Sequence, residues 1–248
     1  MQASSLIWLE PEDPFPPVHL AWSAATEMPG LLAAGGTLDA RRLQQAYRQC
    51  IFPWFSPGQP NLWWSPDPRM VLRVADFRLH PSLRKTLRKF IRAPHCEIRI
   101  NHDFRQVMEH CAHTARHGQH GTWIVDSIIR AYCDLHQQGM AHSVETWIDG
   151  QLAGGLYCVA LGQAVYGESM FAHQTDASKI ALAALVALCR FHGATQIDCQ
   201  QATGHLASLG AREQERAAFI QEAQRMQAQP AMDWNFRPVY WNTLSLGL

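Results

Sequence analysis

The 248-residue sequence lacks an apolar segment long enough to cross a bilayer. Its longest uninterrupted apolar run, residues 180–189, amounts to about half of a membrane span and lies between Lys179 and Arg190. Residues 1–14 have no basic side chain before their apolar part, so we expect no signal peptide. The sequence favours a cytoplasmic protein that does not associate with membranes.

Regularly spaced cysteines are also lacking. The seven cysteines are an odd number, and no two of them are spaced as C-x-x-C. This pattern argues against a disulfide framework and against a zinc ribbon. The sequence has no net charge either, because 21 Lys and Arg balance 21 Asp and Glu. A uniformly basic surface is therefore excluded, whereas a local basic patch is not.

The composition is that of a globular protein, with 47% hydrophobic and 17% charged residues. Prolines and tryptophans gather near the N-terminus, around one helical pattern at residues 38–48 with Thr37 as its expected cap. We therefore predict a small, loop-rich N-terminal domain over residues 1–70.

Residues 71–248 show more regular patterns, which we assign to a second domain. Amphipathic spacing predicts helices at 82–91, 104–116, 127–138 and 176–190. Alternation predicts strands at 142–148, 151–160, 164–171 and 195–200, with a hairpin turn at Asp149-Gly150. This order predicts an α+β fold, close to α/β, in which helices flank a mixed sheet.

The densest aromatic segments are residues 51–58 (IFPWFSPG) and 63–69 (WWSPDPR). A proline-fixed backbone that carries several tryptophans makes a rigid platform for a flat ring. The same residues also suit a small apolar core in a loop-rich domain.

A basic stretch follows, from Arg69 to Arg92, and contains a single acidic residue, Asp76. Such a strip suits a phosphate backbone, but an ordinary solvated helix face has the same composition. The candidate phosphate-contacting residues are Arg69, Arg73, Arg84, Lys85, Arg88, Lys89 and Arg92.

A histidine-rich segment is the only candidate for a metal site. It comprises His110, Cys111, His113, His117 and His120. No carboxylate or cysteine pair completes a tetrahedral ligand set, so we expect no metal and no other cofactor.

Polar residues interrupt two predicted strands. Glu168 lies in an otherwise apolar strand, and Asp198 and Gln200 are two residues apart on another, so they share one face. A buried acid is unfavourable unless it is hydrogen-bonded, so these residues form either a catalytic group or a structural network between strands.

Together these segments closely resemble the leucyl/phenylalanyl-tRNA–protein transferases. The resemblance covers residues 30–213 and includes residues 121–124 (GTWI), 167–171 (GESMF), 197–200 (IDCQ), 177–179 (ASK), His205 and 207–211 (ASLGA). It departs from the family pattern at Cys50, at Ala172 and at Gln214-Glu215, and the last change bears on the conformation of the chain after Gly210.

The resemblance implies an acetyltransferase-like (GNAT) domain behind the small N-terminal one. It implies transfer of Leu or Phe, and less readily Met, from Leu-tRNA or Phe-tRNA to proteins that begin with Arg or Lys. Such products are marked for degradation in the bacterial N-degron pathway. Nothing in the resemblance requires an oligomer, and we expect a monomer.

The resemblance also implies roles for individual residues. Trp54 would stack on the terminal adenosine of the tRNA. Glu168, Asp198 and Gln200 would form the polar catalytic group, and the strip from Arg69 to Arg92 would hold the tRNA phosphates. From the chemistry of aminolysis we expect Gln200 to orient the acceptor amine and Asp198 to polarise Gln200 or relay the proton. We expect Glu168 to hold that pair and to favour a cationic N-terminal residue. The pocket for the aminoacyl side chain would be lined by Trp123, Leu156, Val165, Met170, Leu182, Leu185 and Ile197.

Two alternatives from other classes remain. An acetyl-CoA-dependent N-acetyltransferase needs a glycine-containing pyrophosphate loop, and residues 173–179 contain no glycine. A non-catalytic tRNA- or RNA-binding module would need only the basic strip and the tryptophans, and would leave Glu168, Asp198 and Gln200 without a purpose.

Overall fold

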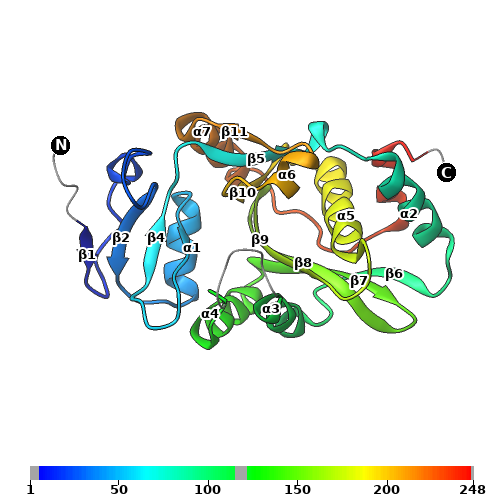
Figure 1. Cartoon of the computed structure of the whole chain (residues 1–248), viewed down its shortest axis with the longest axis horizontal. Helices are drawn as coiled ribbons and strands as arrows, with labels where there is room; N and C mark the ends of the chain where they lie inside the picture. Colours follow the sequence, from blue (N-terminus) through cyan, green and yellow to red (C-terminus); the bar gives the residue numbers. More distant parts are fainter. Residues whose placement is uncertain (1–5, 115–121, 247–248) are drawn as a thin grey trace.

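The computed structural model describes residues 6–114 and 122–246. Near the N-terminus it contains a four-stranded sheet in the order β1-β2-β4-β3, with helix α1 (Ala40–Arg48) beside it (Figure 1). The strands of this sheet are β1 (Ile7–Leu9), β2 (Leu31–Gly35), β3 (Phe52–Pro53) and β4 (Leu62–Trp64). We predicted a loop-rich region here, whereas the structure contains a sheet. Its strands are too short to show alternation in the sequence.

The rest of the chain is organised around a seven-stranded sheet in the order β11-β5-β10-β9-β8-β7-β6. Its strands are β5 (Arg69–Arg73), β6 (Cys96–Ile100), β7 (Ala141–Ile148), β8 (Gln151–Leu161), β9 (Ala164–Ala172), β10 (Gln196–Gln200) and β11 (Arg212–Gln214). Neighbouring strands are antiparallel except β9 and β10, which are parallel. The predicted mixed sheet is therefore confirmed.

Helices cover both faces of this sheet. They are α2 (Pro81–Arg92), α3 (Phe104–His113), α4 (Asp126–Gln137), α5 (Ala177–His192), α6 (Gly204–Ser208) and α7 (Arg216–Gln227), with short 3-10 turns at Val18–Leu20, Val74–Asp76 and Pro238–Leu244. Figure 1 shows α3 and α4 on one side of β8 and α5 on the other. Within the described ranges no helix has the length and apolar character of a membrane span.

Alternate residues of the sheet face two separate cores. One core lies under α1, α3, α4 and α7 and continues into the N-terminal sheet, and the other lies under α2 and α5. On β9, for example, Tyr166 belongs to the first core and its neighbour Val165 to the second. The period of two in the sequence thus sorts the strand residues between the cores.

The main patterns in residues 71–248 are confirmed. Asp149 and Gly150 both have positive φ in the β7–β8 turn, as a two-residue hairpin requires, and Gly139 has φ +74° just after α4. The predicted cap of α1 is wrong, because the side chain of Asp39, not Thr37, accepts a hydrogen bond from the Arg42 backbone N–H.

The departures from the family pattern are accommodated in the fold. Cys50 adopts φ +60°, a left-handed conformation that favours glycine. After Gly210 the chain adds β11 to the edge of the sheet, where Gln214 is paired with Arg69, and then forms α7. Phe219, Ala223 and Met226 of α7 are buried, so this helix covers the first core.

Candidate functional site

The candidate site lies where the parallel strands β9 and β10 part. They are paired only at Val165 with Ile197 and at Tyr166 with Asp198. Beyond this point each strand carries a bulge. The β8–β9 register skips Glu168, and the β5–β10 register skips Cys199. Bulges redirect side chains next to functional sites, and here they bring Glu168 and Gln200 together between the diverging strands.

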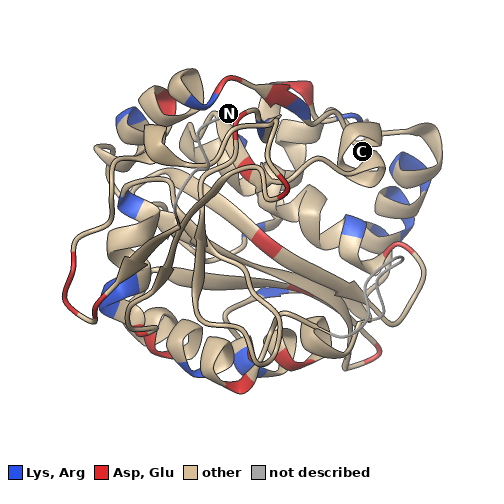
Figure 2. Cartoon of the chain, turned by 60° about the vertical axis from the view of Figure 1, so that its left-hand side comes forward, with Lys and Arg blue, Asp and Glu red and all other residues tan. Residues whose placement is uncertain are grey.

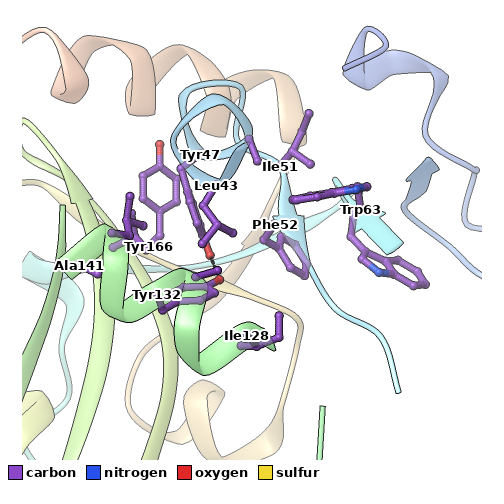
Figure 3. Close-up of a cluster of buried hydrophobic side chains, with 14 of the residues drawn as sticks. Leu43, Tyr47, Ile51, Phe52, Trp63, Ile128, Tyr132, Ala141 and Tyr166 are labelled. Carbon is purple, nitrogen blue, oxygen red and sulfur yellow. Dashed lines mark hydrogen bonds between the residues drawn. The ribbon is translucent and has the colours of Figure 1, made fainter. Parts of the chain in front are cut away.

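Glu168 is held by donors from three directions. The Tyr47 hydroxyl donates to its Oε1 at 2.6 Å, and the Gln200 amide Nε2 donates to the same oxygen at 2.8 Å. The Tyr132 hydroxyl lies 3.2 Å from Oε2 and 2.5 Å from the Tyr47 hydroxyl. Figure 3 shows Tyr47 of α1 and Tyr132 of α4 directed toward each other. A half-buried carboxyl is thus fixed by side chains from both parts of the molecule.

The surroundings shift the titration of Glu168. Burial raises the pKa of its carboxyl from 4.5 to about 7, although the hydrogen bonds from Tyr47 and Gln200 oppose the increase. Burial also raises the pKa of Tyr47 and of Tyr132 well above 10, so both hydroxyls keep their protons and remain donors. The carboxyl therefore changes charge near neutral pH.

Asp198 and Gln200 do not form the side-chain pair that their spacing predicts. Both carboxylate oxygens of Asp198 accept from Arg69, Oδ1 from Nε at 2.8 Å and Oδ2 from Nη2 at 2.6 Å. Oδ1 also accepts the Gln200 backbone N–H at 2.8 Å. Gln200 has φ +61°, and its side chain extends to Glu168 instead. Asp198 thus contacts Gln200 through the backbone.

The predicted pocket residues fall into two groups. Trp123 lies in the first core, where Trp54 packs against the same cluster. The others lie in the second core between α5 and the sheet, and they are Leu156, Val165, Leu182, Leu185, Ile197 and the half-buried Met170. Leu156 is the cross-strand neighbour of Met170, and Val165 that of Ile197. The structure therefore gathers six of the eight aminoacyl- and adenosine-site candidates.

Most aromatic side chains of the two aromatic segments are buried, which agrees with the interpretation of these residues as a small apolar core. Trp63 is fully buried and donates its ring N–H to the Gly35 carbonyl at 2.9 Å. Trp64 donates to the Trp54 carbonyl and packs edge-on to the Trp54 ring, with centroids 5.4 Å apart. Trp54 itself is only half-buried, so it is the ring in this segment that remains available for stacking.

The basic stretch does not form one surface. Arg69 is fully buried against Asp198, so its assignment as a tRNA contact is wrong. Arg73 is exposed but lines a different groove, beside α7. The remaining candidates lie on α2, where Figure 2 shows basic positions along the helix next to the C-terminal end of the chain. Four of them line a groove of about 480 Å³: Lys85, Arg88, Lys89 and Arg92.

Two arginines of α2 also have structural partners. Arg84 donates to the Ser245 carbonyl at 2.8 Å, and Arg88 donates to the Leu246 carbonyl at 2.7 Å. Lys85 and Lys89 have no such partner among the described residues. Both are exposed and lie away from the buried face of α2. Lys85, Lys89 and Arg92 are therefore the residues of this face that are best suited to contact phosphates.

The histidine-rich segment is only partly described. His110 packs near His173, with ring centroids 4.4 Å apart, while His117 and His120 lie outside the described residues. Among residues 6–114 and 122–246 there is no group of three His, Cys, Asp or Glu side chains arranged to hold a metal ion.

Sequence reasoning did not identify Tyr47 and Tyr132 as part of the site. Both have the apolar spacing of helix residues that face a core, and both are indeed fully buried. Their hydroxyl contacts to Glu168 depend on how α1 and α4 pack on the sheet, which local patterns do not reveal. A buried tyrosine hydroxyl needs a hydrogen-bond partner. This need was the one indication in the sequence that Tyr47 and Tyr132 contact a polar group.

Comparison with known proteins places these residues in a family context. The family model described as Leucyl/phenylalanyl-tRNA protein transferase matches residues 71–224, and the corresponding N-terminal domain model matches residues 36–67. Proteins named leucyl/phenylalanyl-tRNA–protein transferase are 58% identical in Albidiferax ferrireducens (98% of this chain, 96% of that protein) and 56% identical in Polaromonas sp. (96% and 93%). A solved structure of L-PGS from Bacillus licheniformis has a TM-score of only 0.36, with 10% identity over 71% of this chain and 57% of that one.

The Tyr47 contact predicts a measurable shift in the titration of Glu168. In the native protein its side-chain carboxyl, followed by 13C NMR, should titrate at about pH 7. Tyr47→Phe removes a donor to the charged form, worth about 1.5–3 kcal/mol, and should raise this pKa by about one unit or more. Because the folded pKa exceeds 4.5, this carboxyl lowers the free energy of unfolding as pH rises from 4.5 to about 7.

Tyr166→Phe is the matched control for that titration. The Tyr166 hydroxyl accepts from the Gln227 side chain at 2.8 Å, and Glu168 is not among its partners. The control should leave the Glu168 titration in place. Equal titration curves for Tyr47→Phe and Tyr166→Phe would show that the Tyr47 hydrogen bond does not act on the carboxyl.

Proposed function

This chain belongs to the leucyl/phenylalanyl-tRNA–protein transferase family, and we propose that it transfers Leu or Phe, and less readily Met, from aminoacyl-tRNA to proteins that begin with Arg or Lys. The product is a protein with one additional N-terminal residue, marked for the N-degron pathway. The donor, aminoacyl-tRNA, is used in the cytoplasm, which is where this reaction belongs.

The reaction is the aminolysis of an activated ester. The acceptor α-amino nitrogen attacks the aminoacyl carbonyl carbon, a C–N bond forms, and the C–O bond to the ribose of the tRNA breaks. The amine loses a proton and the ribose oxygen gains one. Because an α-amine titrates at about pH 8, a useful fraction is already nucleophilic near neutral pH. The main task of the enzyme is then to position the amine against the ester.

The contact between Glu168 and Gln200, just beyond the last paired residues of β9 and β10, is the main support for this proposal. The Gln200 amide nitrogen faces Glu168, so its carbonyl oxygen points away and is suited to accept a hydrogen bond from an amine. Ionised Glu168 supplies a negative charge for the side chain of an N-terminal Arg or Lys. A bound cation would in turn lower the pKa of this carboxyl.

The aminoacyl side chain is proposed to enter the second core between α5 and the sheet. Leu182 and Leu185 of α5 are 4% and 1% exposed, so this region is closed unless a side chain moves. Met170 is the half-buried member of the group and is unbranched, which suits it to make room for a Leu or Phe side chain. Trp123 belongs to the other core.

The tRNA is proposed to lie across Trp54 and α2. The partly exposed Trp54 ring is suited to stack on the terminal adenosine, and the α2 groove suits phosphates. We propose that the protein acts as a monomer.

The proposed fold type is GNAT-like. The parallel pair β9–β10 that parts after two pairings, with α5 following β9, supports this proposal. Acetyl-CoA is a poor fit to the same place, because the N-terminus of α5 carries Asp176, whose carboxylate is already paired with Lys179 at 2.7 Å, and because no glycine directly precedes the helix to let a pyrophosphate approach the backbone. A purely RNA-binding role leaves the Glu168 and Gln200 arrangement without use.

A transfer assay tests the proposal against both alternatives. The protein is incubated with radiolabelled Leu-tRNA and a peptide that begins with Arg, with an Asp-starting peptide as the matched acceptor control. We expect labelled Leu at the N-terminus of the Arg peptide alone and no acetylation from acetyl-CoA. Acetylation, or tRNA binding without transfer, would contradict the proposal.

The α2 geometry also predicts which basic residues matter for tRNA. The double substitution Lys85→Glu and Lys89→Glu should weaken binding of every tRNA alike and reduce the salt dependence by about one unit for each phosphate that the helix no longer binds. The thermal stability should stay nearly unchanged, because neither side chain belongs to the buried face of α2. Filter binding across a salt series measures the first effect, and circular dichroism measures the second.

Two other double variants serve as comparisons in that experiment. Arg41→Glu with Arg105→Glu makes the same change in charge at exposed positions on α1 and α3, and should bind tRNA nearly normally. Arg84→Glu with Arg88→Glu should also lower the melting temperature, because it removes the hydrogen bonds to the C-terminal carbonyls. Equal reductions of binding in the lysine pair and the Arg41 pair would exclude α2 as the tRNA face.

A further inference from the structure

Arg69 forms an ion pair with Asp198 that is fully enclosed. The two side chains are 0% and 1% exposed, and the guanidinium donates to both carboxylate oxygens. It also lies against two rings, 4.7 Å from the centroid of Phe52 and 4.9 Å from that of Phe219. Burial alone would lower the pKa of Arg69, but the Asp198 carboxylate raises it, so the guanidinium remains charged.

The ion pair is linked to the bulge that presents Gln200. Asp198 Oδ1 accepts from both Arg69 Nε and the Gln200 backbone N–H. Gln200 is held at φ +61°, a conformation that a non-glycine residue adopts only when its surroundings require it. The carboxylate supplies the hydrogen bond that satisfies the Gln200 backbone in this conformation, and Arg69 fixes the carboxylate.

We infer that Arg69 and Asp198 are positioning residues, which hold the β10 bulge so that Gln200 meets the acceptor amine, and that Asp198 accepts no proton in the reaction. This inference rests on the proposed function and replaces the role of Asp198 as a proton relay. The Asp198 carboxylate faces Arg69, while the Gln200 side chain faces Glu168, so a relay through the side chains has no continuous path. A fork of two hydrogen bonds also orients a carboxylate more strictly than a point charge would.

Four variants test this inference: Asp198→Asn, Arg69→Gln, the two combined, and Arg69→Lys. For each we would measure kcat and the KM for Leu-tRNA with an Arg-starting peptide, well below the melting temperature determined by circular dichroism. Either single amide variant leaves one buried charge unpaired, so kcat should fall by about 10²-fold while the KM for Leu-tRNA stays unchanged. The pH dependence of kcat should keep its form in Asp198→Asn, because Glu168 and the amine set it, but its Glu168 limb should move to lower pH, because the Asp198 charge helps to raise the pKa of Glu168.

The combined variant separates positioning from proton transfer. It contains no carboxylate at position 198, but the amide introduced there would still accept from the Gln200 N–H and from the new amide at position 69, without an unpaired charge. Most of the kcat should therefore return, so that the two changes are far from additive. A folded combined variant that is as slow as Asp198→Asn would show that the carboxylate itself is needed, and would overturn the inference.

Arg69→Lys keeps the test decisive if the combined variant does not fold. Lysine preserves the charge but not the two-pronged contact, so kcat should fall with little change in the melting temperature. Full kcat in this variant would overturn the inference. The wild-type protein is the reference for the proposed function. If it forms no peptide bond, that function fails, whereas a decrease confined to the variants bears on positioning.

Discussion

The placement of two carboxyl groups, Glu168 on β9 and Asp198 on β10, beside the apolar cores of the sheet is the constraint on which the rest of the site depends. A carboxylate in such surroundings is stable only with donors or a cation beside it. Asp198 meets this requirement with a permanent cation, Arg69, and stays fully enclosed. Glu168 meets it with neutral donors, Tyr47, Tyr132 and Gln200, and keeps part of its surface accessible. Asp198 thus has a cation beside it, whereas Glu168 has only neutral donors. For this reason the two carboxyl groups are suited to different purposes.

These partners join the two parts of the chain into one site. Tyr47 lies on α1, beside the four-stranded sheet, yet its hydroxyl contacts Glu168 in the seven-stranded sheet. Phe52 of the small sheet packs against Arg69. From α7, Phe219 packs against the same guanidinium. The N-terminal part therefore contributes to the proposed catalytic group as well as to the surface proposed for tRNA.

Local patterns were enough to predict the elements with clear periodicity. The β7–β8 hairpin and α5 follow from alternation, turn residues and helical spacing, all of which are properties of neighbours in sequence. The short strands of the N-terminal sheet, β5, β6 and β11 were missed, because two to five residues carry too little pattern, and helix α7 was missed as well. Arg69 was placed on the wrong surface for a related reason. A composition count assigns it to a basic strip, whereas its burial depends on Asp198, 129 positions later in the chain.

The sequence predicted which polar residues of the strands lie at the site better than it predicted how they are arranged. Glu168, Asp198 and Gln200 were recognised as unusual because polar residues in apolar strands need a reason. Strict alternation suggested that Asp198 and Gln200 act as a side-chain pair. The bulges at Glu168 and Cys199 change this, and a bulge is set by the pairing of neighbouring strands, which one sequence segment does not contain.

In the proposed reaction, Glu168 pairs with the positive charge of the acceptor side chain while Gln200 orients the acceptor amine. The most direct measurement compares kcat/KM for two peptides that begin with Arg or with citrulline, its neutral isostere, in the native protein and in Glu168→Gln. We expect a strong preference for Arg in the native protein that largely disappears in the variant, because the variant has no charge to pair with the guanidinium. A folded Glu168→Gln protein that keeps the full preference for Arg would contradict the account.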